Sequence, residues 1–179
     1  MEDVMPNWCD CDLEVEGPEE DRAWFKEFAR SGKDLLSADR FIPYPGKFFC
    51  PDKAAKRWDE KVKAIPDEEE RRGFISHHPR PKDGFNSGGY EWCVEHWGTK
   101  WGICDAEIVE DNEYDLIYKF QCAWSPPNPV IVEMSKQFPG LTFTLRYFEG
   151  GAGYNGILRC SEGKCVQDET AQYFGNRGG

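Results

Sequence analysis

The chain has 179 residues, a formal net charge of −11 and an aromatic content of 15%. This length suits one domain with a substantial core, and so many aromatic residues argue against disorder over most of the chain. The acidic excess argues against salt-dependent binding to nucleic-acid backbones, which requires surplus lysine and arginine. The sequence opens without the features of a signal peptide, and no apolar run approaches the ~18 residues of a membrane-spanning helix. We therefore expect a cytoplasmic protein whose eight cysteines are mostly reduced.

A strand followed by a helix is predicted first. Residues 9–16 alternate strictly between apolar and acidic side chains, as in a strand with one buried face. Pro18 and the acidic residues after it favour the start of a helix, which we expect over residues 19–30. We expect the buried stripe of this helix to consist of Trp24, Phe25, Phe28 and Ala29.

The segment from residue 41 to residue 90 has a different composition, with many charges, prolines and glycines. It predicts a helix over 52–65 with Asp52 as its N-cap, a shorter helix directly after it and a loop over 77–84. Residues 47–82 hold ten basic and seven acidic residues, a net charge of +3, against twelve and twenty-six, or −14, elsewhere. We interpret 41–90 as a charged helical and loop insertion in a single domain of residues 1–179. Its mixed charge is more typical of a solvated surface than of a contact face.

The remainder of the chain predicts a helix, two strands, a second helix and three further strands. Without the insertion the order is βαββαβ followed by a C-terminal β-hairpin, which indicates a ferredoxin-like α+β fold. Its antiparallel sheet has both helices on one face, where we expect Leu13, Val15, Phe120, Phe143 and Leu145 to be buried. The open face is expected to carry Asp12, Glu14 and Glu16 beside Lys119 and Arg146.

The aligned carboxylates and the cysteine pairs are the possible metal ligands. A solvated face with cross-strand ion pairs explains the carboxylates better than a cation site, which needs carboxylates that converge on one point. Cys9 with Cys11, and Cys160 with Cys165, lack the usual spacing of structural zinc sites. The second pair brackets a turn, which leaves zinc as the alternative there. We predict neither a metal nor a cofactor.

The stretch over residues 91–102 is the strongest candidate for a binding site, because it holds three tryptophans, a histidine and a lysine. Rings at this density can stack a planar ligand while basic side chains hold its phosphate or carboxylate. The alternative is that these tryptophans seal the edge of the sheet and anchor the insertion. The candidate ligand-binding residues are His96, Trp97, Lys100, Trp101, Trp124, Arg146, Tyr147 and Glu149.

Catalysis has little support in the sequence. No nucleophile-elbow, P-loop, zinc-protease or dinucleotide motif occurs. We expect no catalytic residues, and one enzymatic alternative remains, a nucleotide phosphodiesterase that uses His96 and Glu149 as acid and base. A module for single-stranded nucleic acid is a further alternative, which the aromatic residues favour and the acidic charge opposes.

Four motifs resemble those of the YubB ferredoxin-like family and together span most of the chain. They are Met-Pro-Asn-Trp-Cys at 5–9 with the alternation that follows to Gly17, Trp-Gly-Thr-Lys-Trp at 97–101, Ala-Trp-Ser-Pro-Pro at 123–127 and Tyr-Phe-Glu at 147–149. The chain departs from the family at Cys11, where asparagine is usual, and at residues 1–4, which resemble an upstream extension.

The resemblance implies a ferredoxin-like fold and an accessory protein of a bacteriophage, prophage or conjugative plasmid. The family has no settled catalytic residues, so none is transferred to this chain. We expect a non-enzymatic protein that acts by binding inside a bacterial cell, for instance in counter-defence. It captures either a nucleotide-like small molecule among the tryptophans or a host protein through its acidic face.

Overall fold

The structure is a computed structural model that describes residues 7–172. The upstream extension expected at residues 1–4, the first two motif residues at 5 and 6, and a tail expected from Gly175 lie outside the described residues. The chain forms two compact units. One combines the residues up to Pro43 with those from Cys93 onward, and the other comprises Tyr44–Trp92.

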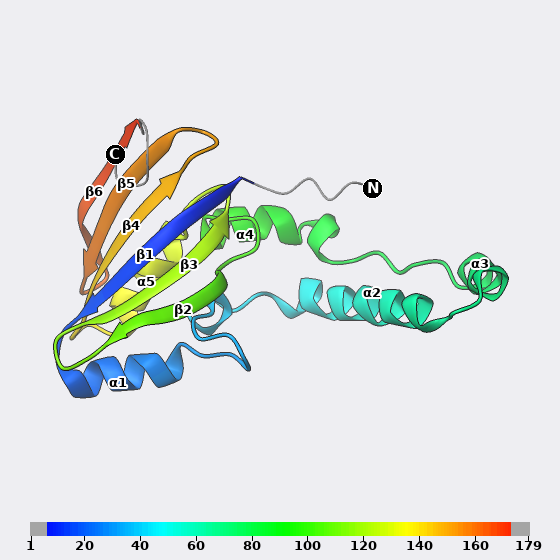
Figure 1. The fold of residues 1–179 in the computed structure, drawn as a ribbon, viewed down its shortest axis with the longest axis horizontal. Helices are drawn as coiled ribbons and strands as arrows, with labels where there is room; N and C mark the ends of the chain where they lie inside the picture. The colour runs from blue at the N-terminus through cyan, green and yellow to red at the C-terminus, as the bar shows by residue number, and fades with distance from the viewer. Residues whose placement is uncertain (1–6, 173–179) are drawn as a thin grey trace. The chain divides into compact units, whose positions relative to one another are not determined.

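The first unit is a six-stranded antiparallel sheet in the order β2-β3-β1-β4-β5-β6, with helices α1 and α5 on one face (Figure 1). Strands β1 to β4 with these two helices have the predicted βαββαβ order, and β5 with β6 form the predicted hairpin. The ferredoxin-like α+β fold is therefore confirmed. The elements are β1 (Trp8–Glu16), α1 (Glu19–Phe28), the 3-10 turn η1 (Ala38–Arg40), β2 (Cys104–Asp111), β3 (Leu116–Ala123), α5 (Asn128–Gln137), β4 (Thr142–Glu149), β5 (Tyr154–Ser161) and β6 (Lys164–Gln172).

Strand β1 lies at the centre of this sheet and separates a covered face from an open face. All five residues predicted for the covered face are buried. On the open face Asp12 lies opposite both Lys119 and Arg146, as predicted. Arg146 donates to Glu14 across 3.0 Å, a solvent-exposed ion pair of the kind that stabilises a fold by at most ~1 kcal/mol.

Helix α1 corrects one prediction, because Trp24 is 60% exposed while its neighbour Phe25 is fully buried. Arg22 on the same helix is buried, although the apolar periodicity of the helix does not predict it. A buried guanidinium needs acceptors for its donors, and backbone oxygens of the β2–β3 turn supply them. Arg22 donates hydrogen bonds to the carbonyl oxygens of Gly17, Asn112 and Glu113.

The second unit is helical, as predicted for the insertion, but its helices begin and end elsewhere. Helix α2 (Gly46–Ala64) starts before Asp52, whose carboxylate accepts hydrogen bonds from the Tyr44 hydroxyl and the Phe85 amide instead of capping the helix. Helix α3 (Glu68–His77) contains His77, which was predicted to lie in a loop. The unit also holds the 3-10 turn η2 (Phe85–Ser87), and helix α4 (Gly89–Trp97) crosses its boundary with the first unit.

Membrane insertion through a helix finds no support here. Across residues 7–172, every helix is either too short or too polar to cross a membrane.

Candidate functional site

Four side chains from three parts of the first unit form a group that we call the tryptophan–lysine cluster. Its members are Trp8 at the start of β1, Lys100 and Trp101 after α4, and Trp124 after β3. The Lys100 ammonium lies 4.5 Å from the ring centre of Trp101 and 4.6 Å from that of Trp124. The rings of Trp8 and Trp101 are 6.1 Å apart. Trp101 is 41% exposed and Trp124 is 43% exposed, so both rings remain accessible to a ligand.

Trp124 adopts an unusual backbone conformation, with φ of +74°. A bulky residue in the left-handed region is strained by roughly 1–2 kcal/mol and stays there only if its surroundings hold it. Hydrogen bonds hold it on both sides. The Trp124 amide donates to the Asn7 carbonyl across 2.9 Å, and the Tyr154 hydroxyl donates to the Trp124 carbonyl across 2.7 Å. Burial raises the pKa of Tyr154 above its ordinary value, so this hydroxyl stays a donor at neutral pH.

The turn that carries Lys100 and Trp101 is tied to the turn that carries Trp124. The Thr99 hydroxyl donates to the Ala123 carbonyl across 2.9 Å, and the Ser125 hydroxyl donates to the Gly98 carbonyl across 2.6 Å. Gly98 itself has φ of +78°, and a β-carbon there would lie 2.7 Å from the ring of Pro129. The two motifs Trp-Gly-Thr-Lys-Trp and Ala-Trp-Ser-Pro-Pro therefore form one pre-organised surface.

Trp97, in contrast, has a structural role. It is buried, and its indole nitrogen donates to the Ile42 carbonyl across 2.8 Å. This contact agrees with the alternative interpretation, in which a tryptophan anchors the start of the insertion. His96, its neighbour on α4, has an exposed side chain with a ring nitrogen 3.9 Å from the Glu95 carboxylate.

Glu149 also has a structural role, at the end of β4. It is 1% exposed, and its two carboxylate oxygens accept the backbone amides of Gly151, across 2.8 Å, and Ala152. Both oxygens hold the β4–β5 turn, so the general acid or base of the enzymatic alternative is already committed to the fold. A proton-transfer role requires a carboxylate that reaches substrate, which this position does not provide.

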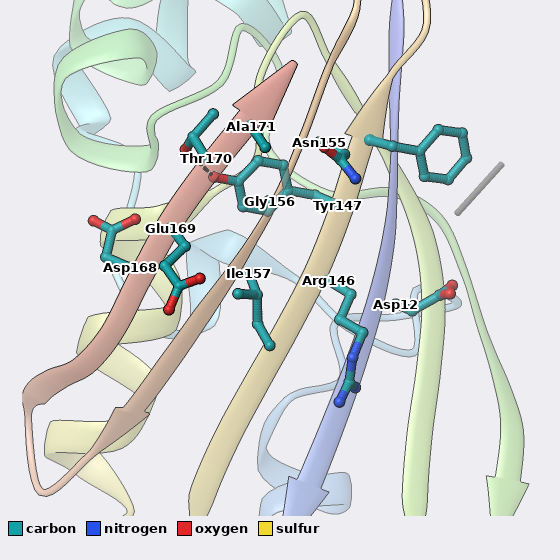
Figure 2. A pocket seen from close by; sticks show the side chains of 11 residues that line it. Asp12, Arg146, Tyr147, Asn155, Gly156, Ile157, Asp168, Glu169, Thr170 and Ala171 are labelled. Atoms are coloured by element: carbon teal, nitrogen blue, oxygen red, sulfur yellow. Dashed lines mark hydrogen bonds between the residues drawn. The ribbon is translucent and has the colours of Figure 1, made fainter. Parts of the chain in front are cut away.

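Arg146 and Tyr147 are neighbours on β4, and their side chains therefore point to opposite faces of the sheet. Arg146 is exposed on the open face in its ion pair with Glu14. Tyr147 is buried opposite Cys11, and its hydroxyl is 2.8 Å from that of Thr170 on β6 (Figure 2). It covers Gly156, where a β-carbon would lie 2.3 Å from the Tyr147 oxygen. Tyr147 thus serves as a clamp across β5.

A groove of about 730 Å³ on strands β1, β4, β5 and β6 was not predicted from the sequence, and we call it the open-face groove. Its apolar lining comes from Phe148, Ile157 and Ala171, which alternate with the covered-face residues of their strands. Its polar lining includes Asp12, Arg146, Asn155 and Glu169, which Figure 2 shows on neighbouring strands. None of the tryptophans lines this groove.

The cysteines pack mainly in the core. Cys160 and Cys165 face each other across the hairpin, as their spacing predicted, with their sulfurs 3.6 Å apart. Burial, together with the neighbouring Cys165 thiol, raises the pKa of Cys160 to about 12, so its thiol is protonated at neutral pH. Within residues 7–172, three or more histidine, cysteine or acidic side chains nowhere converge in a group that could hold a metal ion.

Of the predicted binding residues, the structure therefore brings together Lys100, Trp101 and Trp124. Trp8 was not among the predicted binding residues, although the pairing of β1 with β3 places it near the cluster. It lies opposite Ala123 in the β1–β3 register, which places it beside the end of β3 and hence near Trp124. Recognising that register from the sequence requires the alternation of both strands to be aligned residue by residue.

Comparison with known proteins agrees with this architecture. Residues 97–174, which include most of the tryptophan–lysine cluster, match a family model described as the ferredoxin-like domain in Api92-like protein. Among solved structures the chain is similar to the crystal structure of protein api92 from Yersinia pseudotuberculosis, with a TM-score of 0.55 and 11% identity over 97% of this chain and 100% of that one. No curated protein matches the chain. At this level of identity the likeness to api92 is one of fold alone.

Proposed function

We propose that this chain is a non-enzymatic accessory protein of a bacteriophage or other mobile element that acts by binding inside a bacterial cell, for instance against a host defence system. The observation that carries the binding role is the tryptophan–lysine cluster, in which a strained backbone displays an exposed ring. The mobile-element context rests on the four motifs that resemble the YubB family.

The chemistry of the cluster favours a planar ligand that carries negative charge, such as a nucleotide. Indole rings stack on bases with about 1–3 kcal/mol per base, independently of base identity. Lys100 contacts both Trp101 and Trp124, and it supplies the positive charge that a phosphate group requires. When such a ligand binds, its phosphate forms an ion pair with Lys100 and its base stacks on a tryptophan ring. These two contacts replace the contact between the Lys100 ammonium and the rings.

Titration of intrinsic tryptophan fluorescence with cyclic and NAD-derived nucleotides tests this proposal. We expect quenching that saturates, and at least tenfold weaker binding in Trp101→Ala and Trp124→Ala, equivalent to about 1.4 kcal/mol. The matched control is Trp24→Ala, because Trp24 is exposed on α1 and packs against Phe138 rather than in the cluster. Equal losses in all three variants, or no change in fluorescence and melting temperature across the panel, would contradict nucleotide capture.

A second candidate is a host protein bound through the acidic open face. The observation in its favour is the row of carboxylates on β1, three of which, Asp12, Glu14 and Glu16, share one face of the sheet. Such a complex is expected to be salt-sensitive and to be lost when Asp12 and Glu14 are changed to lysine.

Hydrolysis of a nucleotide is not proposed, because Glu149 is buried and holds a turn. Recovery of an added nucleotide unchanged after incubation with the protein, measured by mass spectrometry, is the expected outcome. Binding to single-stranded nucleic acid remains the weaker alternative, since the chain carries a net charge of −11.

A further inference from the structure

We propose that the open-face groove is a docking site for a lysine- or arginine-bearing segment of a protein partner. The inference rests on the proposed binding function but concerns a different surface from the tryptophan–lysine cluster. It gives the second candidate function a defined location and a defined partner chemistry.

The volume and the lining of the groove favour an organic group over a bare ion. About 730 Å³ lies within the range of protein sites that enclose small ligands or side chains. Phe148, Ile157 and Ala171 give it an apolar floor that a metal ion cannot use. The described residues also offer no cluster of ligands for such an ion.

The charge of the groove selects a cation. Among the residues that line it, the carboxylates of Asp12, Asp168 and Glu169 outnumber one guanidinium, that of Arg146. Three negative groups and one positive group leave a local formal charge of −2, in a chain whose total charge is −11. A concave surface of one sign concentrates the field, which attracts a cation and repels a phosphate.

The wall of the groove also offers an unused acceptor. The side-chain oxygen of Asn155 is buried and has no hydrogen-bond partner within residues 7–172. Buried polar atoms are usually paired, so an acceptor of this kind fits a ligand that brings N–H donors. Ammonium and guanidinium groups are rich in such donors and accept nothing in return.

Lysine and arginine side chains match both parts of the lining. Their methylene stems pack against apolar surface while the charged head remains with carboxylates and amide oxygens. The apolar floor and the acidic rim of the groove are the two halves of that arrangement. A small inorganic cation would satisfy only the rim, and an apolar side chain would satisfy only the floor.

The position of the groove favours a protein segment as the carrier of the cation. Strand β6 contributes Glu169 and Ala171 to the groove and is the last strand of the described sheet. An edge strand has backbone groups that an extended segment can pair with, as in binding by β-strand addition. A segment alongside β6 can therefore place a basic side chain over Ile157.

Fluorescence anisotropy with a labelled peptide of alternating arginine and serine tests the proposal on the full chain. We expect binding that weakens as salt is added, and no binding of the same peptide with glutamate in place of arginine. The double variant Asp12→Asn with Glu169→Gln is expected to bind roughly tenfold more weakly, because it removes two rim charges without changing side-chain size.

The matched control is the double variant Glu20→Gln with Glu27→Gln, which removes two exposed charges from α1. It is expected to bind the arginine peptide within about twofold of the unmodified chain. Ile157→Lys provides a second test that removes no carboxylate. It places a tethered cation in the groove and is expected to block the peptide while nucleotide quenching persists.

Trp101→Ala and Trp124→Ala are expected to leave peptide binding unchanged, which separates this site from the tryptophan–lysine cluster. The proposal is overturned if the arginine peptide does not bind, or if the glutamate peptide binds as well. It is also overturned if the α1 control loses as much affinity as the groove variant, since attraction would then reflect total charge alone.

Discussion

The predicted binding residues separate into a buried group and an exposed group that differ in how their polar atoms are used. In the buried group, Trp97, Tyr147 and Glu149 each hold another part of the fold through a hydrogen bond. In the exposed group, the Lys100 ammonium contacts the rings of both Trp101 and Trp124, and the neighbouring Thr99 hydroxyl bonds to the Ala123 carbonyl. The dense aromatic residues of this chain lie where strands and turns meet. Whether a ring there is available for binding depends on how far the fold buries it.

The largest effect is expected at Glu149, the most buried member of the first group. Glu149→Ala leaves the amides of Gly151 and Ala152 without their acceptor and should lower the free energy of unfolding by about 3 kcal/mol. Glu149→Gln keeps one acceptor oxygen and should lower it by about 1 kcal/mol. Urea denaturation monitored by circular dichroism measures both. If the alanine variant lost less than about 1 kcal/mol of unfolding free energy, the Glu149 carboxylate would not have the structural role proposed for it.

Trp97 and Trp101 provide the most direct comparison between the groups. Trp97→Phe removes the indole donor to the Ile42 carbonyl and part of a buried ring, so the free energy of unfolding should fall by about 2 kcal/mol. Trp101→Phe replaces an exposed ring and should change it by less than about 0.5 kcal/mol. Thermal unfolding of the two variants compares the two losses of stability. If Trp101→Phe were the more destabilising substitution, Trp101 and not Trp97 would be the structural tryptophan.

The strained backbone of Trp124 predicts an unusual order of two substitutions. Glycine adopts a positive φ without steric cost, so Trp124→Gly should be more stable than Trp124→Ala by about 0.5–1 kcal/mol. Trp101 has no positive φ, and there the glycine variant should be the less stable one by a similar amount. Chemical denaturation of the four variants tests whether the sign reverses. If alanine is favoured at both positions, strain at Trp124 does not contribute.

The smallest effect is expected for the ion pair on the open face. Arg146 donates to Glu14 at the surface of the sheet, so a double-mutant cycle with Arg146→Met and Glu14→Gln should give a coupling free energy of about 0.5 kcal/mol. The coupling should decrease further in high salt because the pair is screened. A coupling free energy above about 2 kcal/mol would mean that this ion pair stabilises the fold as strongly as the buried contacts do.

The sequence by itself determined the strands, the order of the elements and the covered face of the sheet. Strict alternation from Cys9 to Glu16 allows only one face of β1 to be buried, and the observed burial follows it residue by residue. The fold class followed because the βαββαβ order has few compact solutions. Periodicity failed at Trp24 and Arg22, since a buried arginine depends on acceptors ninety residues away in the chain.

Only the tertiary structure decided which predicted binding residues are available and where the open-face groove lies. Glu149 and Trp97 became structural because a turn and a distant carbonyl supply their partners, and no local pattern encodes such contacts. The groove exists because register places Asp12, Arg146, Ile157 and Glu169 on adjacent strands of one face. Register is a relation between strands, so it is settled by pairing and packing rather than by any single stretch of sequence.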